Sequence, residues 1–232
     1  MNSLMPIAAL LLCGFATAAD RPATLPDSMA QRLLACTACH ASKEVDDLYF
    51  PRIAGKPAGY LYHQLLNFRD GRRQAPQMSY MVEHMPDAYL REIADYFSTQ
   101  HLAAPKPQPT DVSAAVLARG RQLVTEGDRA HKLPACVACH GARLTGVVPA
   151  IPGLAGLPRD YVNAQFGAWK THVRRANAPD CMAEIANRLS MADVAAISSW
   201  LASQPMPADA RPAESIARPL PLACGSAPEV AP

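Results

Sequence analysis

The sequence has almost no net charge. Its 22 Lys and Arg residues nearly balance its 20 Asp and Glu residues, which leaves a formal charge of +2 at pH 7. Proteins that bind nucleic acid through its phosphates need a broad basic surface. We therefore expect no nucleic-acid partner.

Large aromatic residues are also scarce, with 5 Phe and 2 Trp in a chain of 232 residues. Hydrophobic residues nevertheless make up 50% of the chain, enough to bury one or two cores. No stretch shows a convincing alternation of apolar and polar residues, which half-buried strands would require. The sequence therefore predicts an all-α protein with few aromatic side chains in its cores.

No apolar run is long enough to span a membrane comfortably. Residues 1–19 carry no charged side chain and end in small residues, but the apolar part covers only residues 4–18. A spanning helix needs about 20 residues, whereas small residues at this place are typical of a signal-peptidase site. We predict an export signal over residues 1–19 that carries Cys13 away with it. An uncleaved anchor is the alternative.

Six of the seven cysteines follow this segment, and export to an oxidising compartment means that each needs a chemical partner. Four of them lie in two Cys-x-x-Cys-His motifs, Cys36-Cys39-His40 and Cys136-Cys139-His140. Thiols at this spacing form thioethers with the vinyl groups of a haem, and the adjacent His binds the iron. Zinc would need a fourth ligand nearby, and a redox dithiol would need a strand-helix-strand context. We therefore predict two covalently bound haem c groups, which would also fill the aromatic-poor cores.

The segments that follow the two motifs are alike, which indicates an internal duplication. Each contains a Pro-x-x-x-Gly segment, at residues 51–55 and 152–156, and then three residues spaced i, i+4, i+8 on one helix face. The corresponding triplets are Tyr60, Gln64, Phe68 and Tyr161, Gln165, Trp169.

Proline marks the limits of the repeats. Pro105, Pro107 and Pro109 alternate along the chain, which disfavours a helix and predicts a stiff connector. The residues from 205 onward hold seven prolines and predict an irregular tail. We predict lobes over residues 20–104 and 112–204, a linker over residues 105–111 and a tail over residues 205–232.

The second axial ligand of each iron is less certain from the sequence than the first. Met78 and Met182 occupy equivalent positions in the repeats, and Met sulfur would raise the reduction potential and close the iron to substrates. Met81 and Met85 are rivals in the first lobe, and any of these residues could simply fill a gap in a core. A histidine ligand would lower the potential, but no second histidine repeats between the lobes.

These motifs together resemble the diheme cytochrome c4 family over residues 28–204. The resemblance implies two tandem cytochrome c-like helical domains, each built around a covalently attached haem with His and Met ligands. It implies a periplasmic electron carrier rather than an enzyme. Its partners would be redox proteins such as a membrane-bound cytochrome complex or a terminal oxidase, with peripheral membrane association as an option. The alternatives are a thiosulfate or peroxide oxidoreductase, or the cytochrome subunit of a larger complex such as a flavocytochrome sulfide dehydrogenase.

Two cysteines fall outside the family pattern. Cys181 and Cys224 are an even pair in an oxidising compartment, and a disulfide between them would be worth about 4 kcal/mol on the loop-entropy model. The alternative makes Cys181, next to Met182, a thiolate ligand of the second haem, which would favour an enzyme.

Basic residues follow both aromatic stripes. Such runs either form a solvated helix end or attract an acidic docking face or the haem propionates. They are Arg69, Arg72, Arg73 and Lys170, Arg174, Arg175.

Overall fold

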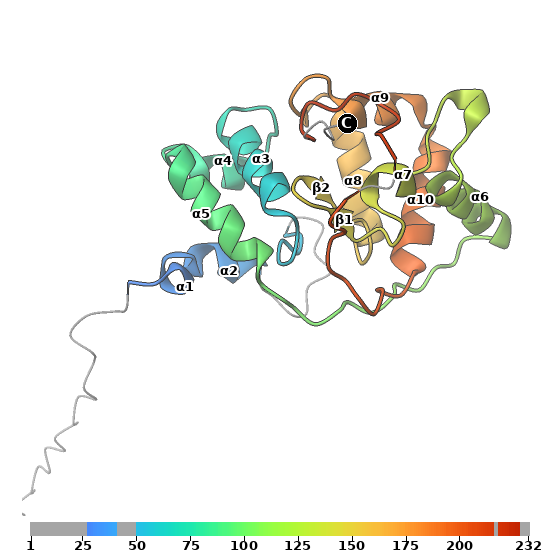
Figure 1. Cartoon of the computed structure of the whole chain (residues 1–232). Helices are drawn as coiled ribbons and strands as arrows, with labels where there is room; N and C mark the ends of the chain where they lie inside the picture. The colour runs from blue at the N-terminus through green and yellow to red at the C-terminus, as the bar shows by residue number, and fades with distance from the viewer. Residues whose placement is uncertain (1–26, 41–49, 216–217, 228–232) are drawn as a thin grey trace, which may run out of the picture.

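The computed structural model describes residues 27–40, 50–215 and 218–227. Figure 1 shows two groups of helices side by side, joined by an extended segment. The prediction of an all-α fold is confirmed, with one small two-stranded sheet in the described residues. The predicted export signal over residues 1–19 lies outside these ranges.

The described part of the first lobe contains five helices, and α3 packs against both α4 and α5. Helix α5 buries Leu90, Ile93, Ala94 and Phe97, whose spacing of three and four residues makes one apolar stripe. The helices are α1 (Met29–Arg32), α2 (Leu34–His40), α3 (Ala58–Arg69), α4 (Pro76–Val82) and α5 (Asp87–Ser98).

The second lobe is built around α10, which packs against α6 and α8. A capping box between Ser190 and Asp193 starts α10. Helix α6 lies close to it at Gly120, where a Cβ atom would come within 2.1 Å of the Ala196 carbonyl oxygen. The elements are α6 (Ala114–Thr125), the 3-10 helix η1 (Arg129–His131), α7 (Val137–His140), β1 (Gly146–Val147), β2 (Ile151–Pro152), α8 (Arg159–Lys170), α9 (Cys181–Arg188) and α10 (Met191–Ser203).

The chain between and after the lobes is extended. No helix or strand occurs between Ser98 and Ala114, where the linker is predicted. After α10 the chain returns along the second lobe, and Ala213 pairs with Val147 of β1. None of the helices in the described ranges combines the length and the hydropathy that crossing a bilayer requires.

Candidate haem sites

The second lobe holds a cavity onto which the residues of its predicted haem site converge. Cys136, Cys139 and His140 from α7 and the segment before it line this cavity together with Met182 from α9. The two elements are far apart in the sequence, and the fold brings them to one space. Apolar side chains from α6, α8, α9 and α10 form most of the wall: Leu123, Phe166, Trp169, Ile185, Leu189, Ile197 and Leu201.

Both motif histidines are oriented by the same contact. Nδ1 of His40 lies 2.8 Å from the carbonyl oxygen of Pro51, and Nδ1 of His140 lies 2.7 Å from that of Pro152. A carbonyl oxygen only accepts, so Nδ1 carries the proton and donates it. Nε2 is left with a lone pair, the state in which imidazole binds a metal. The repeated Pro-x-x-x-Gly segments thus supply the acceptor that fixes each imidazole.

Burial keeps these groups uncharged. It lowers the pKa of His40 and of His140, which favours the neutral imidazole that iron requires. It raises the pKa of Cys136 to about 12, so this sulfur is a neutral thiol rather than a reactive thiolate. A redox dithiol does not fit such a residue.

The first lobe shows a matching arrangement. Cys36 and Met78 both pack against the core cluster around Leu33, Leu61 and Phe68, as Cys136 and Met182 pack against the core of the second lobe. Met81 is 36% exposed, whereas Met85 packs against the core as Met78 does. Burial therefore favours Met78 over Met81 as the ligand, and the assignment stays a prediction.

Two polar atoms at the second cavity lack partners. Trp169 and Ser226 line it, and both the indole Nε1–H and the Ser226 hydroxyl are buried without a hydrogen-bond partner among the described residues. Lys56 from the first lobe also lines the cavity, and burial lowers its pKa. A donor left unpaired in a buried place is costly. Donors and a cation around an apolar cavity fit an apolar macrocycle that carries carboxylates, as haem does.

Two arginines cross between the lobes in a nearly symmetric arrangement. Arg73 of the first lobe hydrogen-bonds to Tyr161 and Gln165 of the second, and Arg174 of the second hydrogen-bonds to Tyr60 and Gln64 of the first. Each arginine also bonds the glutamine of its own lobe, at 2.9 Å for Arg73 and 2.6 Å for Arg174.

The backbones also pair at this point. Arg73 and Arg174 form an antiparallel bridge. Its flanking bonds run from Gln74 N to Val173 O, at 2.9 Å, and from Arg175 N to Arg72 O, at 2.7 Å. The Tyr-x-x-x-Gln pattern of the repeats therefore joins the lobes to one another.

The expectation of a solvated helix end is wrong for Arg174. Arg174 is only 6% exposed, and its guanidinium lies 4.0 Å from the centre of the Trp169 ring. Arg73 lies similarly over Phe68. All side-chain hydrogen bonds of the two arginines in the described part of the chain go to tyrosines and glutamines, none to a carboxylate. Because a buried cation without an anion is unfavourable, the site favours the predicted pairing with haem propionates.

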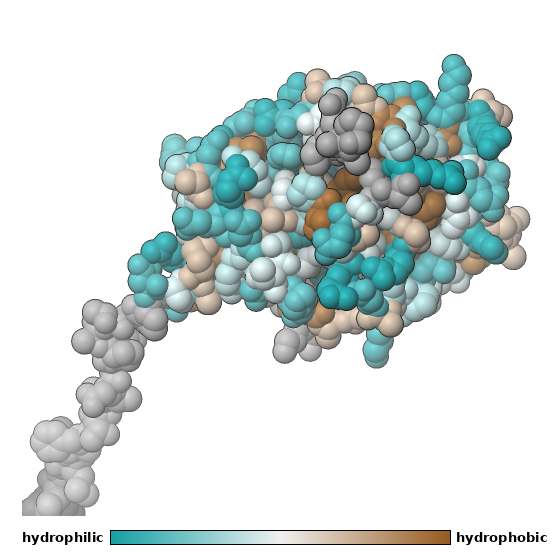
Figure 2. Space-filling view, viewed as in Figure 1, coloured by the Kyte–Doolittle hydropathy of each residue, from teal (hydrophilic) through white to brown (hydrophobic). Residues whose placement is uncertain are grey.

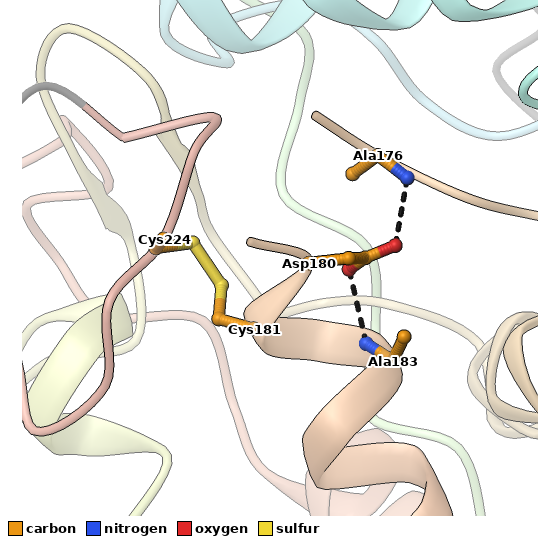
Figure 3. Close-up of a disulfide and its surroundings, with 5 residues drawn as sticks. All are labelled: Ala176, Asp180, Cys181, Ala183 and Cys224. Atoms are coloured by element: carbon orange, nitrogen blue, oxygen red, sulfur yellow. Dashed lines mark hydrogen bonds between the residues drawn. A yellow bond between two sulfur atoms is a disulfide. The ribbon is translucent and has the colours of Figure 1, made fainter. Parts of the chain in front are cut away.

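Cys181 and Cys224 are joined by a disulfide (Figure 3). Cys181 is the first residue of α9, whose N-terminus Asp180 caps by accepting from Ala183 N at 3.0 Å. Asp180 also accepts from Ala176 N, which fixes the preceding loop. A sulfur bonded in this way is not a thiolate, so the structure does not support Cys181 as a haem ligand.

No family model matches the chain. Cytochrome c4 of Pseudomonas aeruginosa is 30% identical over 204 residues, which cover 87% of this chain and 98% of that protein. The chain belongs to the diheme cytochrome c4 family. It is a diheme electron carrier, with covalently bound haem c.

Solved structures agree with this membership. Reduced cytochrome c4 from Pseudomonas stutzeri matches this c4-family chain with a TM-score of 0.64 at 27% identity, over 75% of this chain and 95% of that one. The chain is also similar to a protein of Thiomonas intermedia named thiosulfate dehydrogenase electron acceptor. The identity is 33% over 209 residues, 89% of this chain and 93% of that protein.

A structure of thiosulfate dehydrogenase (TsdBA) from Marichromatium purpuratum matches with a TM-score of 0.65 at 32% identity. The match covers 75% of this chain and 37% of that longer one.

Some features of the sites were not found from the sequence. The proline carbonyls that orient the histidines and the crossing of Arg73 and Arg174 depend on which backbone atoms and lobes meet. The repeat itself was the available signal, because Arg73 and Arg174 follow Gln64 and Gln165 at the same distance.

Proposed function

We propose that this cytochrome c4-family chain is exported to the periplasm, accepts electrons from a thiosulfate dehydrogenase and passes them singly to a later redox protein. The cavity shared by the Cys-x-x-Cys-His motif and Met182 carries the proposal for the site. Two relatives with this electron-acceptor name support the proposed donor, each 33% identical over 86% of the chain or more.

Residues of the chain hold the proposed ligands of each iron in fixed positions, independent of the oxidation state of the iron. When bound, each haem supplies an iron that changes its oxidation state by one electron. His40 and His140 present Nε2 from imidazoles fixed by proline carbonyls. Met78 and Met182 are the residues we assign as the second ligands, and their thioethers would close each iron to substrates. Little needs to move when the charge of the site changes.

The lobe interface fixes the distance between the two sites. The crossing arginines, the backbone bridge and a further bond of 2.9 Å from Gly59 N to Pro149 O hold the lobes together. These contacts would keep the two haem sites at a constant separation for electron transfer.

The test is reduction of the oxidised holoprotein, followed by the growth of its α-band. We expect rapid reduction when a purified thiosulfate dehydrogenase and thiosulfate are both present, and none with either alone. Reduction by thiosulfate alone would make this chain the enzyme. No reduction with the complete mixture would exclude this donor.

A second candidate is a carrier that serves the respiratory chain without thiosulfate. The relatives named cytochrome c4 favour it. Reduction by a membrane-bound quinol-oxidising cytochrome complex, at a rate above that with the dehydrogenase, would support this candidate.

A further inference from the structure

The last described residues form an extended segment over the second cavity. We call residues 218–227 the C-terminal strap. Exposed and partly buried residues alternate along the strap. Pro219, Pro221, Ala223 and Gly225 are exposed, and the residues between them are partly buried. Those between them line the cavity: Leu220, Leu222, Cys224 and Ser226. Figure 2 shows strongly hydrophobic side chains gathered near the middle of this face.

Three contacts hold the strap in place. Cys224 is bonded to Cys181, the residue before Met182. Gly225 N donates to the carbonyl of Pro179 at 2.9 Å. A Cβ atom on Gly225 would lie 2.1 Å from the carbonyl oxygen of Ala178, so only glycine allows this close approach. The strap is therefore fixed to the segment that begins α9.

The strap also reaches the first lobe. His63 of α3 lies beside the backbone of Ser226. Ser226 lines the second cavity together with Lys56 and Tyr60 of the first lobe, so the strap and the first lobe both form part of its wall.

The two lobes differ in this respect. Residues 20–104 contain no cysteines except those of the motif, so no disulfide can attach a corresponding segment to the first lobe. Among the described residues, the second site thus has a disulfide-bonded cover that has no counterpart at the first.

We propose that the C-terminal strap is part of the second haem site, and that by excluding water it raises the reduction potential of that haem. This rests on the proposed assignment of the second cavity to haem. The ferric state carries one more positive charge than the ferrous state. Removing water penalises the more highly charged state.

The experiment is a spectroelectrochemical titration of the holoprotein with a matched pair of variants. Leu222→Asn places an amide on the face toward the cavity, and Ala223→Asn places the same amide on the exposed face. For Leu222→Asn we expect one of the two potentials to fall until the equilibrium constant for electron exchange between the haems changes tenfold. This corresponds to 59 mV for a one-electron couple. Ala223→Asn should leave both potentials unchanged.

A second measurement uses the natural sequence. The disulfide is reduced with a water-soluble phosphine, the thiols are alkylated, and the haems are reoxidised with ferricyanide. The same fall of one potential should follow, because the strap is then free to leave. Unchanged potentials in both experiments, or an equal fall of both potentials, would overturn the proposal.

The mass of each purified protein distinguishes a failure of the strap proposal from a failure of the proposed function. A mass with two haems shows that the sites are filled, so a negative titration counts against the strap alone. A mass without two haems would contradict the assignment of the cavities.

Discussion

Removing the crossing arginines offers a sharp test of how the lobes are joined. Gln64 and Gln165 each accept a hydrogen bond from both Arg73 and Arg174. In Arg174→Met both glutamines therefore keep a donor, and of the four tyrosine and glutamine acceptors only the hydroxyl of Tyr60 loses its partner. We expect this variant to lose about 1–3 kcal/mol of unfolding free energy, the usual cost of one unpaired buried group. Arg73→Met should cost about the same through Tyr161.

The double variant should behave differently from the sum. With both arginines gone, both glutamines and both tyrosines lose their donors. The repulsion between the two guanidiniums is also relieved in each single variant, but it can be relieved only once in the double variant. Both effects have the same sign, so the double variant should cost at least about 1 kcal/mol more than the two single variants together.

The assay is unfolding of the holoprotein in guanidinium chloride, followed by far-ultraviolet circular dichroism. Arg175→Met is the control, because Arg175 is exposed and, within the described ranges, hydrogen-bonds through its backbone. It should change the stability by no more than about 0.5 kcal/mol. If the single variants added within about 0.5 kcal/mol, the shared-acceptor explanation would be refuted.

Other predictions concern the helices, acid stability and the ligands. Gly120→Ala should lower the unfolding free energy by about 1–3 kcal/mol, because the added methyl group meets Ala196. Gly167→Ala should raise it by about 0.5–1 kcal/mol, because a Cβ atom there meets no other part of the described structure within 4 Å. Equal effects of the two variants in chemical denaturation would contradict the packing of α6 on α10. Hydrogen bonds from Arg119 and then His131 lower the pKa of Asp128 from 3.8 to about 2. The stabilisation from this carboxylate is therefore complete above its ordinary pKa and lost as the pH falls through about 2, and Asp128→Asn should remove this part of an unfolding series against pH. Met78→Leu and Met182→Leu should each abolish the near-infrared Met-to-iron absorption of one haem. Met81→Leu should leave the absorption of both haems unchanged. Loss of the absorption of one haem in Met81→Leu would show that Met81, not Met78, is the ligand.

The sequence allowed the fold class to be predicted because it contains a repeat. Two motifs with the same flanking residues are strong evidence, and the all-α fold and the family membership are confirmed. The ligands Met78 and Met182 stay predictions, although the cavity of the second lobe includes Met182.

What could not be predicted depends on contacts between distant parts of the chain. The basic residues after each aromatic stripe suggested a surface, because charge in a sequence carries no information on what covers it. Only the fold places Arg174 beneath the other lobe and the strap over the cavity. The disulfide between Cys181 and Cys224 had been one of two open alternatives, since spacing does not determine connectivity.

The sharing of both glutamines by both arginines has a consequence for the history of the duplicated chain. One lobe expressed alone would leave its arginine and its tyrosine facing solvent, whereas each now contacts the tyrosine or the arginine of the other lobe. A mutation at Gln64 or Gln165 removes an acceptor from both arginines, so a change in either copy at these positions affects the contacts of the other. The interface therefore depends on both copies, because a lobe separated from the other would lose the acceptors that the other lobe provides to its arginine.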